Sequence, residues 1–389
     1  MSYKVQISGD FVSPSGYSKA TRAHAKALIV SGVDVIFENK KFDPTTIELD
    51  PWWKAEYSMR SNRKERADIK IFHHTPDLAQ PGPAHINIAM VPWETSRLPD
   101  IDLLNQSKYN WVKQLNKMDL VWTFAKSSKE AMLSSGVTVP IEVLAHPIDP
   151  SLCYYTPKDM TTEIFDQNRQ PLHKGWFKFL SIFQYIPRKD PVSLLVAYLS
   201  EFTADENVVL ILKTYHTNVG DLDSIKKNIA ELKSKIKLPH RAPRVVLVPG
   251  VLTDSQIGDL MRASDCSVVT SHGEGFALNA IESVAVGTPA IVPNGSCFPD
   301  HIDESRGYLV KTHTEPVHGI SHSPWYSCDQ SWHRIDILDL KKRMREAYTD
   351  RKGLTDRAEN GVRYSKCLYP AKIGQIMKES LESLLVKRL

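Results

Sequence analysis

The sequence predicts an α/β protein built from two Rossmann-like domains. Its 389 residues are enough for two domains of ordinary size. Segments with strand character alternate with segments of helical spacing in two separate series. Between them, residues 150–174 are rich in Thr, Pro, Asp and Gln and lack apolar periodicity, so we place the linker there. We expect an N-terminal domain over 1–165, completed by a terminal helix over 371–389, and a C-terminal domain over 166–370.

The first series begins with a strand at Lys4–Ser8, a turn-rich loop, a helix at Tyr17–Ser31 and a strand at Val33–Phe37. This order opens a Rossmann-type domain, but the loop lacks the Gly-x-Gly-x-x-Gly pattern of dinucleotide-binding proteins. Residues 39–68 are polar and are expected to form an irregular insertion. The remaining expected elements are strands at 69–72, 85–91, 120–124 and 141–144 and helices at 106–117 and 127–135.

The second series predicts another parallel sheet with helices on both faces. Its expected strands lie at 177–185, 207–214, 244–249, 266–271 and 289–293, and its helices at 191–202, 222–237, 254–263 and 277–286. Residues 313–334 are loop-like and are expected to be an insertion. Helices at 336–350 and 354–366 then close the domain, and Pro370 separates them from an amphipathic helix at 371–388.

Composition is that of a globular protein, with 24% charged residues and a formal net charge of +4. That charge is too small to indicate a nucleic-acid partner by itself. The five cysteines are scattered and form no zinc-type spacing, which favours reduced thiols in a cytoplasmic protein. The N-terminus is strand-like and does not resemble a signal peptide, and no apolar run approaches the ~18 residues of a spanning helix.

The most informative stretch is HGEGFALNAIESVAVGT, residues 272–288. It follows an apolar strand, contains a tight glycine-bearing loop and continues as a helix that ends at Gly287. A helix start directs its N–H groups at one point and suits an anion such as a diphosphate. Glu274 lies in the loop, and Glu282 is expected about two turns into the helix, where it could hold a ribose. Each Glu alone has a simpler reading, as a helix-start charge or a solvated helix residue.

The residues EGFALNAIE, followed by SVAVGTPAIVPNG, resemble the donor-site signature of retaining glycosyltransferases of the GT-B, family 4-like (glycosyl transferases group 1) type. This large group includes sucrose synthases, glycogen synthases and many bacterial mannosyltransferases. The resemblance implies two Rossmann-like domains facing across a cleft and a last helix that crosses back to the N-terminal domain. It also implies a nucleotide-sugar donor in the C-terminal domain and an acceptor in the N-terminal one. Glu274 is then catalytic, Glu282, Gly275, Phe276, Ala277 and Leu278 bind the donor, and Ala277 replaces the family's usual Gly.

Basic residues follow two strands of the second series. Arg188 and Lys189 lie in the loop after the first strand, at the edge where α/β folds bind ligands. Two cations there can neutralise a leaving diphosphate, a role that the family gives to a Lys in this loop. Arg188 is our candidate for a family Arg whose place is taken by Gln184. Lys213 is a further candidate for phosphate, with a strand-terminating role equally favoured, and Gly16 is a candidate in the first glycine-bearing loop.

Two polar clusters end strands of the first series and are expected on the acceptor side. The first contains His73, His74 and Asp77, and the second contains Trp93, Glu94 and Arg97. Many relatives have a His in the second loop, whereas this chain has Trp93 and Glu94. We therefore assign Glu94 a catalytic orienting role, and we expect at least one His of the first cluster to be simply hydrogen-bonded.

No metal is expected. The pairs Asp100/Asp102 and Asp221/Asp223 match the short Asp-x-Asp pattern of metal-dependent glycosyltransferases, but both precede helical stretches where Asp is a normal cap. The resulting hypothesis is a metal-independent retaining transfer from a nucleotide sugar to a hydroxyl acceptor such as a glycan. Hydroxymethylated bases in DNA remain an alternative acceptor because of the basic patch Arg60–Arg66. A non-catalytic sugar-nucleotide or glycan-binding protein and a sugar-nucleotide epimerase are the alternatives of other kinds.

Overall fold

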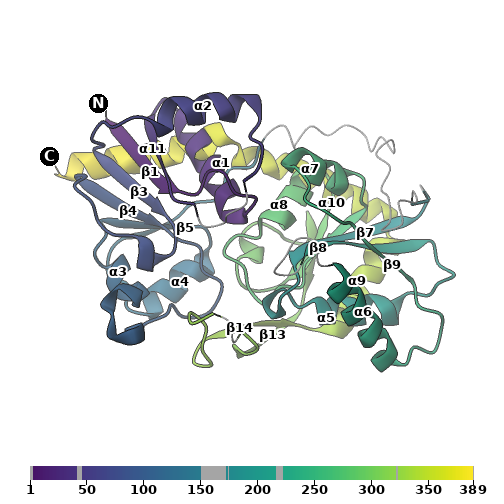
Figure 1. Cartoon of the computed structure of the whole chain (residues 1–389). Helices are drawn as coiled ribbons and strands as arrows, with labels where there is room; N and C mark the ends of the chain where they lie inside the picture. The colour runs from purple at the N-terminus through teal and green to yellow at the C-terminus, as the bar shows by residue number, and fades with distance from the viewer. Residues whose placement is uncertain are drawn as a thin grey trace. The chain divides into compact units, whose positions relative to one another are not determined.

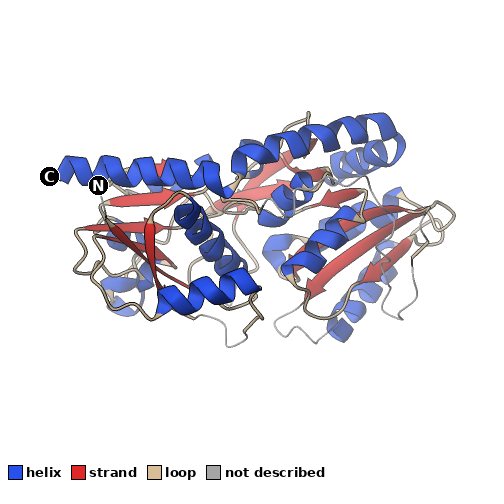
Figure 2. Ribbon diagram, turned by 90° about the horizontal axis from the view of Figure 1, so that it is seen from above, coloured by secondary structure: helices blue, strands red, loops and turns tan. Residues whose placement is uncertain are grey.

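A computed structural model describes residues 3–41, 46–149, 172–173, 175–215, 222–320 and 323–388. The chain separates into two units, one formed by 1–150 with 367–389 and the other by 151–366. Each unit is built around its own parallel sheet, and each is described by itself (Figures 1 and 2). The linker expected at 150–174 and the boundary expected at 165/166 fall largely outside the described residues.

The first unit has a six-stranded parallel sheet in the order β2-β1-β3-β4-β5-β6. Its strands are β1 (Lys4–Gly9), β2 (Asp34–Asn39), β3 (Ile69–His73), β4 (Ile86–Met90), β5 (Leu120–Thr123) and β6 (Ile141–Val143). Its helices are α1 (Gly16–Val30), α2 (Pro51–Ser61), α3 (Trp111–Leu115), α4 (Lys126–Ser134) and α11 (Pro370–Arg388).

The C-terminal helix α11 returns to this unit and packs along α1, as the yellow and purple helices show in Figure 1. Gly374 makes the close approach possible, because a Cβ there would lie 2.0 Å from the carbonyl oxygen of Ala27. Polar contacts add to this packing: Lys378 donates to the carbonyl of Ser31 over 3.2 Å and Ser380 to Glu142 over 2.6 Å. The expectation of a terminal helix that belongs to the N-terminal domain is confirmed.

The second unit has another six-stranded parallel sheet, in the order β12-β11-β10-β7-β8-β9. Its strands are β7 (Phe177–Gln184), β8 (Val208–Tyr215), β9 (Arg244–Leu247), β10 (Cys266–Val268), β11 (Ala290–Pro293) and β12 (Gly307–Val310). Its helices are α5 (Pro191–Glu201), α6 (Leu222–Ile236), α7 (Asp254–Arg262), α8 (Leu278–Ala285), α9 (Ile337–Thr349) and α10 (Arg351–Ser365).

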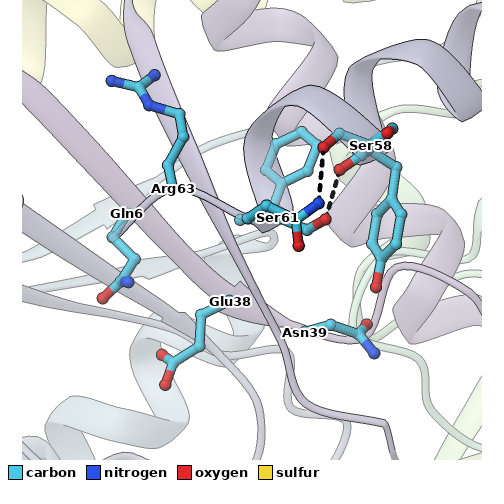
Figure 3. A pocket seen from close by; sticks show the side chains of 9 residues that line it. Gln6, Glu38, Asn39, Ser58, Ser61 and Arg63 are labelled. Atoms are coloured by element: carbon cyan, nitrogen blue, oxygen red, sulfur yellow. Dashed lines mark hydrogen bonds between the residues drawn. The ribbon is translucent and has the colours of Figure 1, made fainter. Parts of the chain in front are cut away.

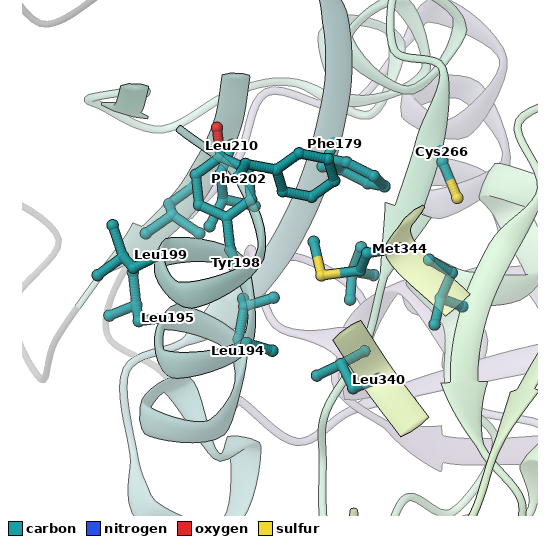
Figure 4. Close-up of a cluster of buried hydrophobic side chains, with 14 of the residues drawn as sticks. Phe179, Leu194, Leu195, Tyr198, Leu199, Phe202, Leu210, Cys266, Leu340 and Met344 are labelled. Carbon is teal, nitrogen blue, oxygen red and sulfur yellow. The ribbon is translucent and has the colours of Figure 1, made fainter. Parts of the chain in front are cut away.

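Both faces of this sheet are buried, which explains the almost continuous apolar runs of β7 and β8. One face carries Phe179 and Leu210 into a cluster with α5 and α9, shown in Figure 4. The opposite face carries Leu180 and Ile211 into a second cluster that includes residues of α7. Successive strand residues therefore serve opposite layers.

Three expectations about local structure are wrong. The insertion expected at 39–68 contains α2, whose start is capped by Asp50 accepting from the Trp53 amide, with Pro51 in the first turn. The helix expected at 106–117 is regular only over Trp111–Leu115 and follows short 3₁₀ turns. The loop expected at 313–334 forms an antiparallel pair, β13 (Thr312–Pro316) with β14 (Ser331–Ile335). No described helix combines the length and apolarity that crossing a membrane requires.

Candidate active site

The loop after β7 is a tight reversal that presents two cationic side chains. Pro187–Lys189 form a 3₁₀ turn, and Asp190 then adopts a left-handed conformation with φ of 46°. The Asp190 carboxylate caps α5 by accepting from the amide of Ser193 over 3.0 Å. The hydroxyl of Thr270 donates to the carbonyls of Lys189 and Asp190. This loop is therefore tied to the segment that follows β10.

The segment after β10 leads to α8 through a second left-handed residue, Ala277, with φ of 63° and ψ of 52°. This is the position where the resembled family usually has Gly, because a residue without a Cβ enters this region at little cost. The Ser296 hydroxyl accepts from the Glu274 amide over 3.1 Å and donates to its carbonyl over 3.0 Å. Ser296, which follows β11, therefore fixes the backbone around Glu274.

Arg188, Lys189 and Glu274 form one ion-pair cluster. Arg188 donates to the carboxylate of Glu274 over 3.2 Å and to the carbonyl of Gly273 over 2.6 Å. Lys189 forms an ion pair with the other oxygen of the same carboxylate. Their side chains are only 14–19% exposed. With two cations and one anion, the cluster has a net charge of one positive unit at a partly buried site.

The electrostatics of this cluster favour an ionised Glu274. Burial by itself would raise the pKa of its carboxyl group, but Lys189 and Arg188 lower it more, to about 2. The carboxylate is thus a permanent anion under ordinary conditions, and its charge is compensated by the two side chains that we assigned to phosphate. The sequence suggested both roles separately and did not suggest that the three groups contact one another.

Helix α8 begins at Leu278, and Ala277 provides no side-chain cap for its first amides. A helix start of this kind attracts anions through its N–H groups and dipole. Glu282 is the fifth residue of α8, so the expectation that it lies two turns into the helix is wrong. The axial rise from Leu278 to Glu282 is only ~6 Å. Its side chain is 3% exposed. Asn279 fastens the same helix to the sheet by donating to the carbonyl of Ile182 over 3.0 Å.

The other predicted donor residues have different settings. Phe276 is buried, and its ring meets that of His301 edge-on at a centroid distance of 4.7 Å. Gly275 is partly exposed in the loop between Glu274 and this anchor. Lys213 is buried and donates to the carbonyl of Gly250 over 2.5 Å, and burial lowers the pKa of its amine. No contact in the described part of the chain brings Lys213 to Glu274.

Gly16 is the first residue of α1, in the other unit. A Cβ at this position would have no neighbour within 4 Å, so packing inside the unit does not require glycine. Ser15 caps the helix by accepting from the amide of Ser18 over 3.1 Å. Open space above a helix start agrees with a ligand-facing role for Gly16 but equally with an ordinary turn.

The strand-end clusters of the first unit are more buried than expected. His73 is 1% exposed, and its Nδ1 is hydrogen-bonded to the hydroxyl of Thr21 at 2.7 Å. Trp93 is also buried, and its indole donates to the carbonyl of Arg97 over 2.7 Å, which closes its loop. The expectation that these two side chains face a ligand is therefore corrected. Glu94 is partly exposed and Arg97 is exposed.

His74 and Asp77, the other members of the first cluster, differ in exposure. His74 is 2% exposed at the end of β3, and Asp77 is partly exposed in a 3₁₀ turn over Pro76–Leu78. The pKa of His74 is lowered by burial to about 4. The imidazole is therefore neutral near pH 7.

Two further histidines, which the sequence analysis missed, lie beside His73. His24 comes from the interior of α1 and His146 from the segment after β6; their Nδ1 atoms are 3.3 Å apart. Both rings pack against Phe124, with centroids 5.3 and 3.8 Å away. Burial lowers the pKa of His24 to about 4 and that of His73 well below its usual value. A histidine on the buried face of a predicted helix was the available signal for His24.

The missed hairpin β13–β14 contributes residues next to the ion-pair cluster. The ring of His272 stacks on Trp332 with a centroid distance of 4.4 Å. The amide of His333 donates to the carbonyl of His272 over 2.9 Å. His272 in turn donates its amide to the carbonyl of Arg188 over 2.8 Å. The hairpin thus supports the loop that carries Glu274, although its residues lie about 60 positions further along the chain.

The acidic pairs and the basic patch are largely engaged in local contacts. Asp100 accepts from the side-chain amide of Asn110 over 3.0 Å, and Asp102 pairs with Lys113. Asp221 lies outside the described residues. Within the described ranges, no group of three or more His, Cys, Asp or Glu side chains is placed to hold a metal ion.

In the basic patch, Arg60 pairs with Glu56 at 2.5 Å, and Arg63 pairs with Asp34 and Glu65. Arg66 donates to the carbonyl of Pro83 over 2.5 Å. The two arginines that face acids therefore contribute little net positive charge to this surface.

Known proteins share the two-unit α/β architecture of this chain, and one family matches part of its second unit. Residues 168–318 match the family described as Glycosyl transferases group 1. The sucrose-phosphate synthase of Thermosynechococcus elongatus superposes with a TM-score of 0.68 at 16% identity, covering 99% of this chain and 100% of its own. HepE of Anabaena, solved with UDP-glucose, has a TM-score of 0.66 at 16% identity, covering 98% and 100%. A glycosyltransferase of Rickettsia africae has a TM-score of 0.62 at 13% identity, covering 98% of each chain.

These matches define the class of protein. The fold is GT-B, and the protein is a glycosyltransferase. More particularly, the part of its second unit that matches the Glycosyl transferases group 1 family includes Arg188, Lys189, Glu274 and Glu282. No curated protein matches the sequence itself.

Proposed function

We propose that this glycosyltransferase moves a sugar from a nucleoside diphosphate sugar to an acceptor hydroxyl with retention of anomeric configuration. The observation that carries the proposal is the cluster of Arg188, Lys189 and Glu274 within the same unit as the uncapped start of α8. Cations and helix-start amides are the groups that a departing diphosphate needs. Retention is inferred from the family resemblance.

In the proposed reaction, the donor diphosphate replaces the Glu274 carboxylate as the partner of Arg188 and Lys189. The bond between the anomeric carbon and the phosphate oxygen breaks, and its electron pair stays on that oxygen. The acceptor oxygen bonds to the anomeric carbon on the same face, and its proton passes to the leaving diphosphate. The growing negative charge is stabilised most strongly in the transition state, so both cations act mainly on turnover.

Glu282 is proposed to accept hydrogen bonds from the donor ribose, with Gly275, Phe276, Ala277 and Leu278 shaping the adjoining site. UDP is the first nucleotide to test, because HepE was solved with UDP-glucose. We propose that no metal is required, since two cationic side chains are present where the diphosphate would lie.

A glycan is the preferred acceptor. The pairing of Arg60 and Arg63 with acids weakens the case for DNA, because phosphate contacts require cations that are available to the backbone. Glu94 remains proposed to orient the sugar or acceptor. The non-catalytic alternative predicts donor binding without turnover, and the epimerase alternative predicts donor conversion with no acceptor present.

The test is steady-state release of UDP from UDP-sugars by the wild-type chain and by Lys189→Ala. We expect Lys189→Ala to lower kcat by about 10²–10³ with a smaller change in donor KM. Arg188→Ala should behave similarly. Lys235→Ala is the matched control, because Lys235 is exposed in α6 and pairs with Glu231 of the same helix. Near-normal kcat in Lys189→Ala would place the phosphate site elsewhere.

Metal dependence is tested in the same assay. Activity should persist in EDTA, because the proposed counter-charges belong to the protein. Loss of activity in EDTA with rescue by Mn²⁺ would contradict metal independence, and NMR of the product's anomeric proton tests retention.

A further inference from the structure

The first unit contains a polar cavity that is lined by Arg63 of the basic patch but by no other residue predicted to belong to a site. Its volume is about 670 Å³, and it lies where β1 and the edge strand β2 meet α2 (Figure 3). Gln6 and Glu38 project from neighbouring strands on the same side of the sheet, since Gln6 pairs in register with Ile36 and Ser8 with Glu38. Tyr57 and Ser58 come from α2. The cavity is within the ~300–1,000 Å³ range of small-molecule sites.

The charges around this cavity are compensated by neighbouring protein groups. Glu38 forms ion pairs with Lys70 at 2.7 Å and Lys40 at 3.2 Å. Burial would raise the pKa of Glu38, but these lysines and Ser8 lower it to about 2, so the group is a carboxylate. Arg63 is paired with Asp34 and Glu65. An ionic ligand would therefore have to break existing pairs, whereas a neutral ligand would not.

The cavity nevertheless has hydrogen-bonding groups available. Among the described residues, the Gln6 amide and the Tyr57 hydroxyl make no hydrogen bond, whereas Ser61 and Asn62 donate to carbonyls of α2, as the dashed lines in Figure 3 show. The carbonyl oxygen of the Asn39 amide accepts from the Phe11 amide over 3.0 Å, which fixes that side chain at the cavity wall. An amide both donates and accepts, and so does a phenolic hydroxyl.

The cavity also has an apolar side. The Tyr57 ring lies 6.4 Å from the ring of Phe37 and 6.2 Å from that of Phe11. Phe37 also lines the cavity. These two sides suit a ligand that combines hydroxyl groups with apolar C–H faces. The hydroxyl groups can bond to the amides and the carboxylate, and the C–H faces can pack on the aromatic rings.

We propose that this cavity binds a neutral oligosaccharide. Gln6, Asn39, Tyr57 and Glu38 bind sugar hydroxyls, and the Tyr57 and Phe37 rings contact the apolar face of a sugar ring. The volume accommodates a ligand of disaccharide or trisaccharide size.

The test is isothermal titration calorimetry of the full chain with four neutral saccharides: sucrose, lactose, maltotriose and cellotriose. We expect at least one to bind, and we expect Gln6→Ala and Tyr57→Phe each to weaken that binding about 2- to 12-fold, as for one neutral hydrogen bond. Met59→Ala is the matched control, because Met59 is 56% exposed on the same helix and does not line the cavity. Its affinity should equal that of the wild-type chain.

A parallel thermal-shift measurement with UDP separates the two proposals. If UDP stabilises the chain but none of the four saccharides binds, the cavity proposal is overturned and the proposed function stands. Saccharide binding that Gln6→Ala and Tyr57→Phe leave unchanged also overturns it. If saccharide binds through these residues but UDP neither stabilises the chain nor is released from UDP-sugars, the proposed function fails and the cavity proposal stands. Tighter binding of a DNA duplex than of any saccharide would overturn the assigned ligand class.

Discussion

The guanidinium of Arg188 donates to the carboxylate of Glu274 over 3.2 Å, so a residue proposed to bind phosphate is paired with an internal anion. Lys189 contacts the other oxygen of the same group. If a diphosphate binds these cations as proposed, it has to replace the carboxylate as their partner. The proposed exchange of one anion for another would lower the affinity for the diphosphate.

Glu274→Gln should therefore bind UDP more tightly than the wild-type chain, because the cations no longer have an internal competitor. Charge-assisted hydrogen bonds contribute ~1.5–3 kcal/mol each, so the gain should reach tenfold or more. The same variant should be less stable in the absence of ligand and should have a lower kcat. Calorimetry with UDP and chemical denaturation give the two readouts. Weaker UDP binding in a folded Glu274→Gln protein would show that the carboxylate contacts the donor directly.

Glu282→Ala should weaken nucleotide binding by ~1.5–3 kcal/mol if the carboxylate holds the ribose. The side chain is nearly fully buried in α8, so circular dichroism must first show that the variant folds. Asn279→Ala is a useful comparison, because it removes a bond from the same helix to the sheet without removing a charge. An unchanged Kd for UDP in folded Glu282→Ala would remove the ribose assignment.

The buried histidines should make the protein sensitive to acid. An unfolded His titrates near pH 6.5, whereas burial lowers the pKa of folded His24 and His74 to about 4. The unfolded state then binds more protons between these values, so the free energy of unfolding falls as pH drops from about 6.5 towards 4. For His24 the loss is on the order of 3 kcal/mol at ~1.4 kcal/mol per pKa unit.

Urea denaturation at intervals from pH 7 to pH 4 measures this effect. His24→Gln should flatten the dependence, because it removes one titrating ring from the cluster. Glu38 and Glu274 each pair with nearby cationic side chains, which lower their pKa values to about 2. The stability that these ion pairs contribute is present above pH 4.5 and is lost only at lower pH. A stability that is constant between pH 6.5 and pH 4.5 would contradict burial of neutral histidines.

Gly374→Ala should destabilise the first unit. The added Cβ would overlap the carbonyl oxygen of Ala27 at 2.0 Å, so α11 would have to move away from α1. Overpacking of this kind costs ~1–3 kcal/mol, which a shift in the urea midpoint would reveal. Gly16→Ala is the control with open space around the new methyl group, and its stability should be close to that of the wild-type chain. Equal stability of both variants would show that α11 does not pack closely on α1.

The alternation of strands and helices was readable from the sequence because apolar periodicity and turn residues are local signals. Fifteen-residue α1 and the strands β7 and β8 lie within one or two residues of their predicted positions. The exceptions had weaker or misleading signals: α2 begins at an Asp-Pro cap within a polar stretch, and β13 and β14 pair across a segment rich in His and Trp.

The sequence by itself determined the fold class and the residue types of the proposed donor site, since a strand, a loop with Glu274 and a helix follow one another along the chain. Only the tertiary structure decided which charges meet. Arg188 and Glu274 are 86 positions apart, and their contact depends on two loops that parallel strands bring to the same edge of the sheet. The same holds for the burial of His73 and the pairing of Arg63 with Asp34. Charge and exposure are properties of neighbours in space, which local sequence patterns do not specify.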